Sequence, residues 1–110
     1  MFSQSAVFSV PYRTAKFPKT DEGRILHYSY IVTNKGKAPL VIYSSETECS
    51  CTEVILPKKP IEPGNTEKIE VFFNTNGKYF YQDRLITLKT NSRKKIERLH
   101  LKVFVVPKEQ

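Results

Sequence analysis

The stretch Leu26–Val32 reads Leu-His-Tyr-Ser-Tyr-Ile-Val, with a large apolar or aromatic side chain at every second position. Side chains alternate between the two faces of a β-strand, so this period of two predicts a strand with one face toward a core. Two later stretches, 68–73 and 98–105, repeat the pattern. The residues that we expect to be mostly buried are Leu26, Tyr28, Tyr30, Val32, Ile42, Val71, Phe73, Leu101 and Val103.

Shorter apolar runs and turn signals fill the rest of the chain. The runs 40–43 and 85–88 are continuous, which favours strands buried on both sides, and 7–10 and 15–17 are weaker strand candidates. Clusters of Gly, Asn and Pro, which suit chain reversals, separate the runs. These clusters are Asn34-Lys35-Gly36, residues 60–65, Asn76-Gly77 and residues 91–95.

Strands with spaced turns, and no run of helical period, predict an all-β fold. About seven to eight short strands are typical of an immunoglobulin-like β-sandwich. The length of 110 residues fits one domain, residues 1–110, with a core of its own. Thirteen residues are Phe or Tyr, and each buries a large area, so the 39% hydrophobic fraction is enough for such a core.

The formal net charge of +7 keeps a domain of this size in solution, and it could also attract an anionic partner. The basic residues are scattered along the chain rather than gathered on one segment, so we expect no specific nucleic-acid binding. No stretch has the length of a transmembrane segment. Residues 1–5 lack the basic start and apolar run of a signal peptide.

Cys49 and Cys51 form the one distinctive chemical feature. Positions i and i+2 of an extended strand point to the same side, at the outer limit of disulfide reach. Three interpretations follow: two free thiols, a soft metal such as Cu(I) held by both sulfurs, or a redox-active dithiol or mixed disulfide with a partner. We expect two free, slowly reacting thiols and no metal or other cofactor. The only histidines, His27 and His100, stand at no ligand spacing from the cysteines.

A dense aromatic cluster, Tyr79-Phe80-Tyr81, follows Gly77. Alternation puts Phe80 in the core, with Tyr79 and Tyr81 half exposed on the other side. Tyr is enriched in protein interfaces, so the two tyrosines are the candidate interaction patch, to which Phe72 and Phe104 could add.

The stretch from Asn34 to Asn91 resembles a bacterial family of immunoglobulin-like domains, the domain of unknown function 1573. The matching motifs are Asn34-Lys35-Gly36, Pro39-Leu40-Val41-Ile42, Cys49-Ser50-Cys51-Thr52, Ile61-Glu62-Pro63-Gly64 and Thr90-Asn91. Ser50 stands where the family usually has Gly, and Glu48 where it has Ser. The resemblance implies a fold related to the major-sperm-protein and ASPM-SPD-Hydin-like domains, and export to the periplasm or cell surface. It implies no reaction.

The sequence contains no glycine-rich phosphate loop and no paired carboxylates, and a Cys–His nucleophile is only formally available. We therefore expect a non-enzymatic binding or scaffold module of an exported bacterial protein, with a protein partner that engages loops or an open sheet edge. The alternative is a thiol-based copper or redox module centred on Cys49 and Cys51. The partner's identity and the oligomeric state do not follow from the sequence.

Overall fold

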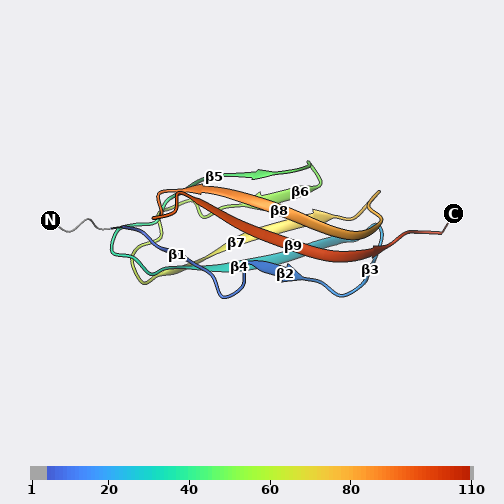
Figure 1. The fold of residues 1–110 in the computed structure, drawn as a ribbon, viewed down its shortest axis with the longest axis horizontal. Coiled ribbons are helices and arrows are strands. Elements are labelled where there is room, and N and C mark those ends of the chain that lie inside the picture. Colours follow the sequence, from blue (N-terminus) through green and yellow to red (C-terminus); the bar gives the residue numbers. More distant parts are fainter. Residues whose placement is uncertain (1–4, 110) are drawn as a thin grey trace.

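The computed structural model describes residues 5–109, which form nine β-strands and no helix (Figure 1). The N-terminal segment forms three short strands, and the later six are longer. The strands are β1 (Phe8–Ser9), β2 (Thr14–Lys16), β3 (Thr20–Asp21), β4 (Ile25–Asn34), β5 (Ile42–Thr47), β6 (Thr52–Ile55), β7 (Thr66–Asn74), β8 (Phe80–Thr90) and β9 (Ile96–Val106).

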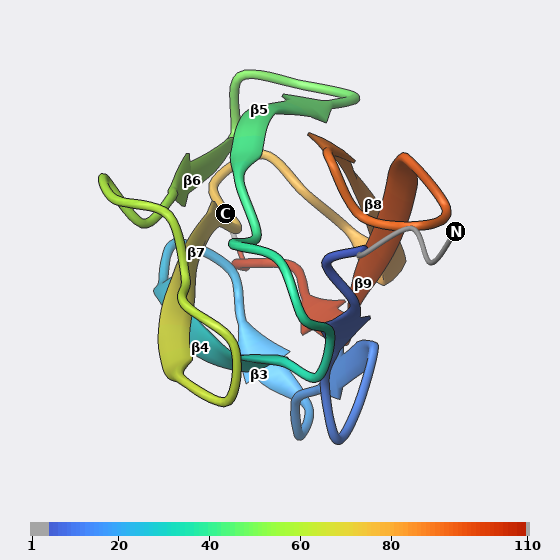
Figure 2. The ribbon, with the colours of Figure 1, turned by 90° about the vertical axis from the view of Figure 1, so that its left-hand side faces the viewer.

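The strands form two sheets packed face to face, as the view along the long axis shows (Figure 2). The first sheet has the order β1-β4-β7-β6 and is antiparallel throughout. The second sheet has the order β2-β9-β8-β5, and β3 also pairs with β9. In this sheet β2 and β3 run parallel to β9, and the other pairs are antiparallel.

The core lies between the two sheets and consists of the side chains that alternation points inward. Tyr30 and Val32 of β4 and the alternating residues of β7, β8 and β9 are buried. The fully enclosed members from these strands are Tyr30, Val32, Ile69, Val71, Phe73, Ile86, Leu88, Leu99, Leu101, Val103 and Val105. Leu26, Tyr28 and Ile42 are half-buried and pack against this core.

The all-β sandwich prediction is therefore confirmed, with nine strands in the described residues rather than seven or eight. The expectation that 40–43 and 85–88 are buried on both sides is wrong. Tyr43 is 63% exposed and Leu85 is half-buried. Both lie on strands of the second sheet, whose outer face no other layer of the described chain covers, so these runs alternate between core and solvent.

The motif Asn34-Lys35-Gly36 ties the first strand to the sandwich. Asn34 is completely buried, and its side chain accepts hydrogen bonds from the amides of Val7 and Gly36. A Cβ on Gly36 would collide with the backbone of residues 5–7, 2.7 Å from the Val7 nitrogen. The motif thus combines a polar anchor with a close backbone approach that only glycine permits.

The sequence predicts no signal peptide in residues 1–5, of which residues 1–4 lie outside the described residues. No helix that could cross a bilayer occurs in the part of the chain that the structure describes. That residues 1–110 form one domain stays a prediction.

Candidate functional site

Four exposed aromatic rings gather where β8 begins and β9 ends. Tyr79, Phe80 and Tyr81 are at least half exposed, and Phe104 is 41% exposed. Tyr81 pairs with Phe104 across the two strands, so both lie on the outer face of the second sheet. The Phe80 and Phe104 ring centroids are 6.1 Å apart. The expected exposure of Tyr79 and Tyr81 therefore holds, and Phe104 lies beside Tyr81. Phe72 cannot add to this patch, because it lies on β7 of the other sheet, stacked on His27.

The expectation that Phe80 lies in the core is wrong, since 58% of its surface is exposed. Phe80 has a φ of 66°, in the left-handed region that bulky residues rarely adopt. This conformation at the first residue of β8 breaks the simple alternation from which the core position was predicted. It also costs on the order of 1–3 kcal/mol, which surrounding structure must offset.

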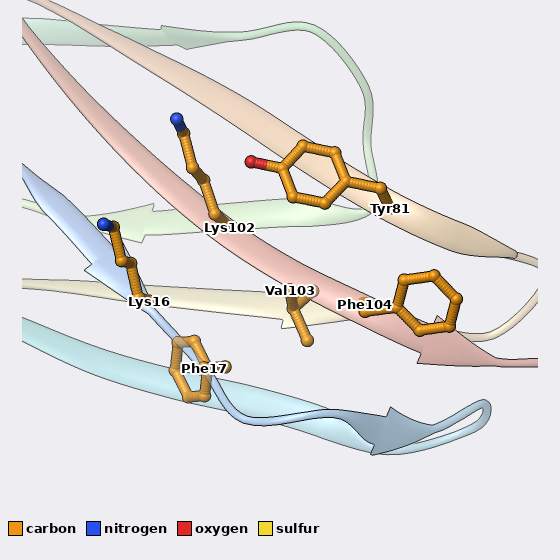
Figure 3. A pocket seen from close by; sticks show the side chains of 6 residues that line it. All are labelled: Lys16, Phe17, Tyr81, Lys102, Val103 and Phe104. Atoms are coloured by element: carbon orange, nitrogen blue, oxygen red, sulfur yellow. The ribbon is translucent and has the colours of Figure 1, made fainter.

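A groove of about 360 Å³ adjoins these rings on the outer face of the second sheet. We call it the aromatic–lysine groove, and its lining residues are Lys16, Phe17, Tyr81, Lys102, Val103 and Phe104. Figure 3 shows the amines of Lys16 and Lys102 on the same side of the groove, with the Tyr81 hydroxyl directed toward Lys102. A second hollow of about 370 Å³, along residues 17–21, shares Phe17 with the groove.

Lysines and aromatic rings are placed together by the parallel pairing of β2 with β9. This register sets Lys16 opposite Lys102, one inter-strand step from Asp83 on β8. The Lys19 amine lies 5.6 Å from the Phe104 ring centroid, within cation–π range. The groove therefore combines apolar and aromatic side chains with the amines of Lys16 and Lys102, of which Lys102 also forms an ion pair with Asp83 at 3.8 Å. This combination suits a partner that presents apolar and acidic side chains.

The histidines lie on the two opposite outer faces of the sandwich. His27 on β4 contacts Glu70 at 3.0 Å, and this contact, with a hydrogen bond from Ser29, lowers the pKa of Glu70. His100 on β9 contacts Asp83 at 2.9 Å. Within the described residues, no three His, Cys, Asp or Glu side chains are grouped as metal ligands.

Cys49 and Cys51 are joined by a disulfide, so the expectation of two free thiols is wrong. The error lies in the assumed strand. Residues 48–51 form the turn through which the chain crosses from β5 to β6, and the two Cα atoms are 5.3 Å apart. This separation is within the normal disulfide range. Ser50 stands at the family's usual Gly position but does not have a positive φ, so its backbone is not strained in that way.

The sequence predicted Tyr79 and Tyr81 as an interaction patch, which stays a prediction, but it did not indicate that Lys16, Phe17 and Lys102 line a groove with Tyr81. Each of these residues alone reads as an ordinary surface or core position. Only the β2–β9 register brings them to one place, and a parallel pairing between segments about 85 residues apart leaves no local sequence signal.

Comparisons with known proteins place this geometry in context. A family model described as "Protein of unknown function (DUF1573)" matches residues 8–105. No curated protein sequence matches the chain.

Solved structures share the fold at low sequence identity. A protein of unknown function from Porphyromonas gingivalis W83 is 15% identical to this chain, with a TM-score of 0.81. The match covers 94% of this chain and 49% of that protein, so this chain spans about half of its length. The human CEP192 ASH/PapD-like domain 7 is 11% identical over 99% and 92% of the two chains, TM-score 0.74. The C. elegans MSP family member WR4 is 9% identical over 92% and 99%, TM-score 0.63. The expected relationship to these domain types is therefore confirmed.

Proposed function

The chain belongs to the DUF1573 family, and from this premise we propose that it is a non-enzymatic protein-binding module whose contact surface is the aromatic–lysine groove. The observation that carries the proposal is that two exposed rings, Tyr81 and Phe104, line the groove, with the exposed Phe80 ring beside Phe104 and the exposed Tyr79 next in the chain. Exposed large apolar patches on a small domain mark interaction sites. Tyr and Phe are also enriched in protein interfaces.

The rim of the groove supports a partner with acidic side chains. Lys16 and Lys102 line the groove, the Lys19 amine lies over the Phe104 ring, and the chain carries a net charge of +7. Charges of one sign around an apolar centre steer an oppositely charged partner and fix its orientation. We do not propose nucleic acid as the partner, since the basic residues elsewhere in the chain are dispersed.

The disulfide supports an oxidising compartment, either the periplasm or the cell surface of a bacterium. Disulfides form and persist outside the cytoplasm and are rare within it. The family resemblance points the same way.

Capture of partners from an extract of the native cells tests the groove. A Tyr81→Ser, Phe104→Ser double variant should lose the captured proteins and stay folded, because Tyr81 is 60% exposed and Phe104 is 41% exposed, both on the outer face of the sheet. Tyr43→Ser is the control matched to Tyr81, since Tyr43 is about as exposed as Tyr81 but lies on β5, away from the groove. If the double variant captures the same proteins as the wild type, the groove is not the contact surface.

The bonded cysteines favour a second candidate function, reversible thiol–disulfide exchange, over copper binding. In this state neither sulfur is a free thiolate, the form that binds soft metals. A partner dithiol would be oxidised as this disulfide is reduced, with two electrons and two protons passing to Cys49 and Cys51. Equilibration in glutathione buffers tests this. A reduction potential below about −300 mV would assign the disulfide a structural role only.

A further inference from the structure

Strand β8 extends beyond its neighbour β5 and leaves one edge of the second sheet open. Ile86–Thr90 pair with β5, whereas β8 pairs with β9 from Phe80 onward. β5 ends at Thr47, where the disulfide turn carries the chain to the other sheet. The segment from Phe80 to Leu85 therefore has a strand partner on one side only, among the residues that the structure describes. We call it the open β8 edge.

The backbone groups that face this opening belong to the odd-numbered residues of β8. The amide of Asn91 donates to Val41 O at 3.1 Å, and that of Leu85 donates to Glu48 Oε1 at 3.2 Å. Both bonds point to the β5 side. Because successive residues of a strand direct their N–H and C=O groups to opposite sides, the groups of Tyr81 and Asp83 also point there. Two residues thus offer donors and acceptors in the spacing that an added strand requires.

The other exposed edges of the sandwich carry features that prevent strand addition. β6 has four residues and is followed by Pro57, Lys58 and Lys59. β5 has a register irregularity between Ile42 and Ser44, and β1 has two residues. The far edge of the second sheet consists of the short strands β2 and β3, with three and two residues. Short length, irregular register, Pro and Lys all disfavour edge pairing. The open β8 edge instead belongs to an eleven-residue strand whose pairing with β9 has no register shift, and its one residue of positive φ is the first, Phe80.

Arg84 gives this edge a charge preference. It pairs with Leu101 and so points inward, with its guanidinium 5.5 Å from the Phe73 ring centroid. Its Nη2 donates to Gln82 Oε1, whereas its Nε is buried and has no hydrogen-bond partner. No carboxylate of the described residues forms an ion pair with it. A partly buried cation with an unused donor disfavours an apolar strand and favours a carboxylate.

We propose that an extended acidic peptide segment of another protein adds as a strand to the open β8 edge. Its backbone bonds to Tyr81 and Asp83, and a carboxylate between the two sheets accepts a hydrogen bond from Arg84. The proposal rests on the protein-binding function above and names the class of partner. A second copy of this chain is disfavoured as the occupant, since it would bring a second Arg84 and another charge of +7 to the edge.

The probe is a blocked nonapeptide in which valine alternates with glutamate, titrated into the ¹⁵N-labelled protein. The amide signals of Tyr81 and Asp83 should shift, and their hydrogen exchange should slow on peptide addition. The matching valine–lysine peptide should cause neither effect. Arg84→Gln should weaken binding of the acidic peptide by about tenfold or more, the scale of one charge-assisted hydrogen bond.

Asp83 supplies a matched pair of variants. Asp83→Pro removes the outward N–H but no β8–β9 ladder bond, so it should abolish binding, whereas Asp83→Ala keeps the N–H and should bind. The wild-type exchange measurement decides the question even if the proline variant misfolds. Unchanged amides at Tyr81 and Asp83 at millimolar acidic peptide, equal binding of the lysine peptide, protection of β6 instead, or dimer formation through this edge would each overturn the proposal.

Failure here is distinguishable from failure of the proposed function. The groove is tested by Tyr81→Ser, Phe104→Ser capture from cells, and the edge by the Arg84 and Asp83 variants with a defined peptide. If the groove variant loses the captured proteins but the peptide does not change the amides of the open β8 edge, the groove remains the interface and only the proposal of an added strand is refuted.

Discussion

Replacing Asn34 with alanine should remove about 3 to 4 kcal/mol from the free energy of unfolding. Asn34 is fully buried, and its amide makes four hydrogen bonds. Its Nδ2 donates to Ala38 O and Ile61 O, both at 2.8 Å, and its Oδ1 accepts from the Val7 and Gly36 amides. Each such bond contributes about 1 kcal/mol net.

The expected loss of stability is smaller than the cost of leaving all four hydrogen-bond partners of Asn34 buried and unpaired. Ile61 O still accepts from the Leu40 amide at 2.9 Å, so its carbonyl keeps a partner. The Val7 and Gly36 amides and the Ala38 carbonyl are only partly buried, so water can reach them. These two corrections hold the expected loss near the sum of ordinary net contributions.

Thermal unfolding followed by circular dichroism measures the effect. For a domain of this length, about 4 °C per kcal/mol predicts a melting temperature about 12 to 16 °C lower. Asn74→Ala is the control, because Asn74 is exposed and its side chain accepts one hydrogen bond, from the Asn76 amide. It should cost less than about 1 kcal/mol. If Asn34→Ala melts as Asn74→Ala does, the anchoring role of the Asn-x-Gly motif is refuted.

Four further changes probe other parts of the account. Gly36→Ala should cost about 2 to 3 kcal/mol in chemical denaturation, since its Cβ meets backbone atoms that cannot move alone. Leu101→Ala should cost about 2 to 4 kcal/mol by the same method. If this variant is as stable as the wild type, Leu101 does not lie on the inward face of β9. Phe80→Gly should leave stability unchanged or raise it by about 1 kcal/mol, because relief of the positive φ offsets the flexibility of glycine, yet it should weaken partner capture. Burial raises the pKa of Tyr30, so stability should fall as the pH rises above about 10, where only the unfolded chain ionises; Tyr30→Phe should remove that part of the loss in pH-dependent melts.

The sequence was most informative where packing repeats a simple period. Tyr30, Val71 and Leu101 are inward by alternation alone, and their burial follows from one sheet face meeting another. The prediction was less good at strand ends. Leu26 and Tyr28 share the inward face of β4 but are only half-buried, so period alone does not fix the depth of burial.

The errors have local physical causes. Phe80 takes a left-handed φ, so the alternation counted from its neighbours places it on the wrong side. The cysteine pair lies in a turn, not a strand, which shortens the Cα separation to 5.3 Å. The partners of Tyr81 were out of reach because Lys16 meets Lys102 through a pairing of distant segments. The unpaired edge of β8 depends on where β5 stops, and strand ends are the least predictable features of a sequence.

The central claim is that a protein partner contacts the aromatic–lysine groove. A photo-cross-linking phenylalanine analogue at position 81, compared with one at position 43, tests it in the native cells. Tyr81 and Tyr43 are about equally exposed, at 60% and 63%, so accessibility alone predicts equal yields. If the groove is the interface, position 81 should give a discrete cross-linked protein and position 43 should give none. Cross-links of equal yield from both positions, or from position 43 alone, would contradict it.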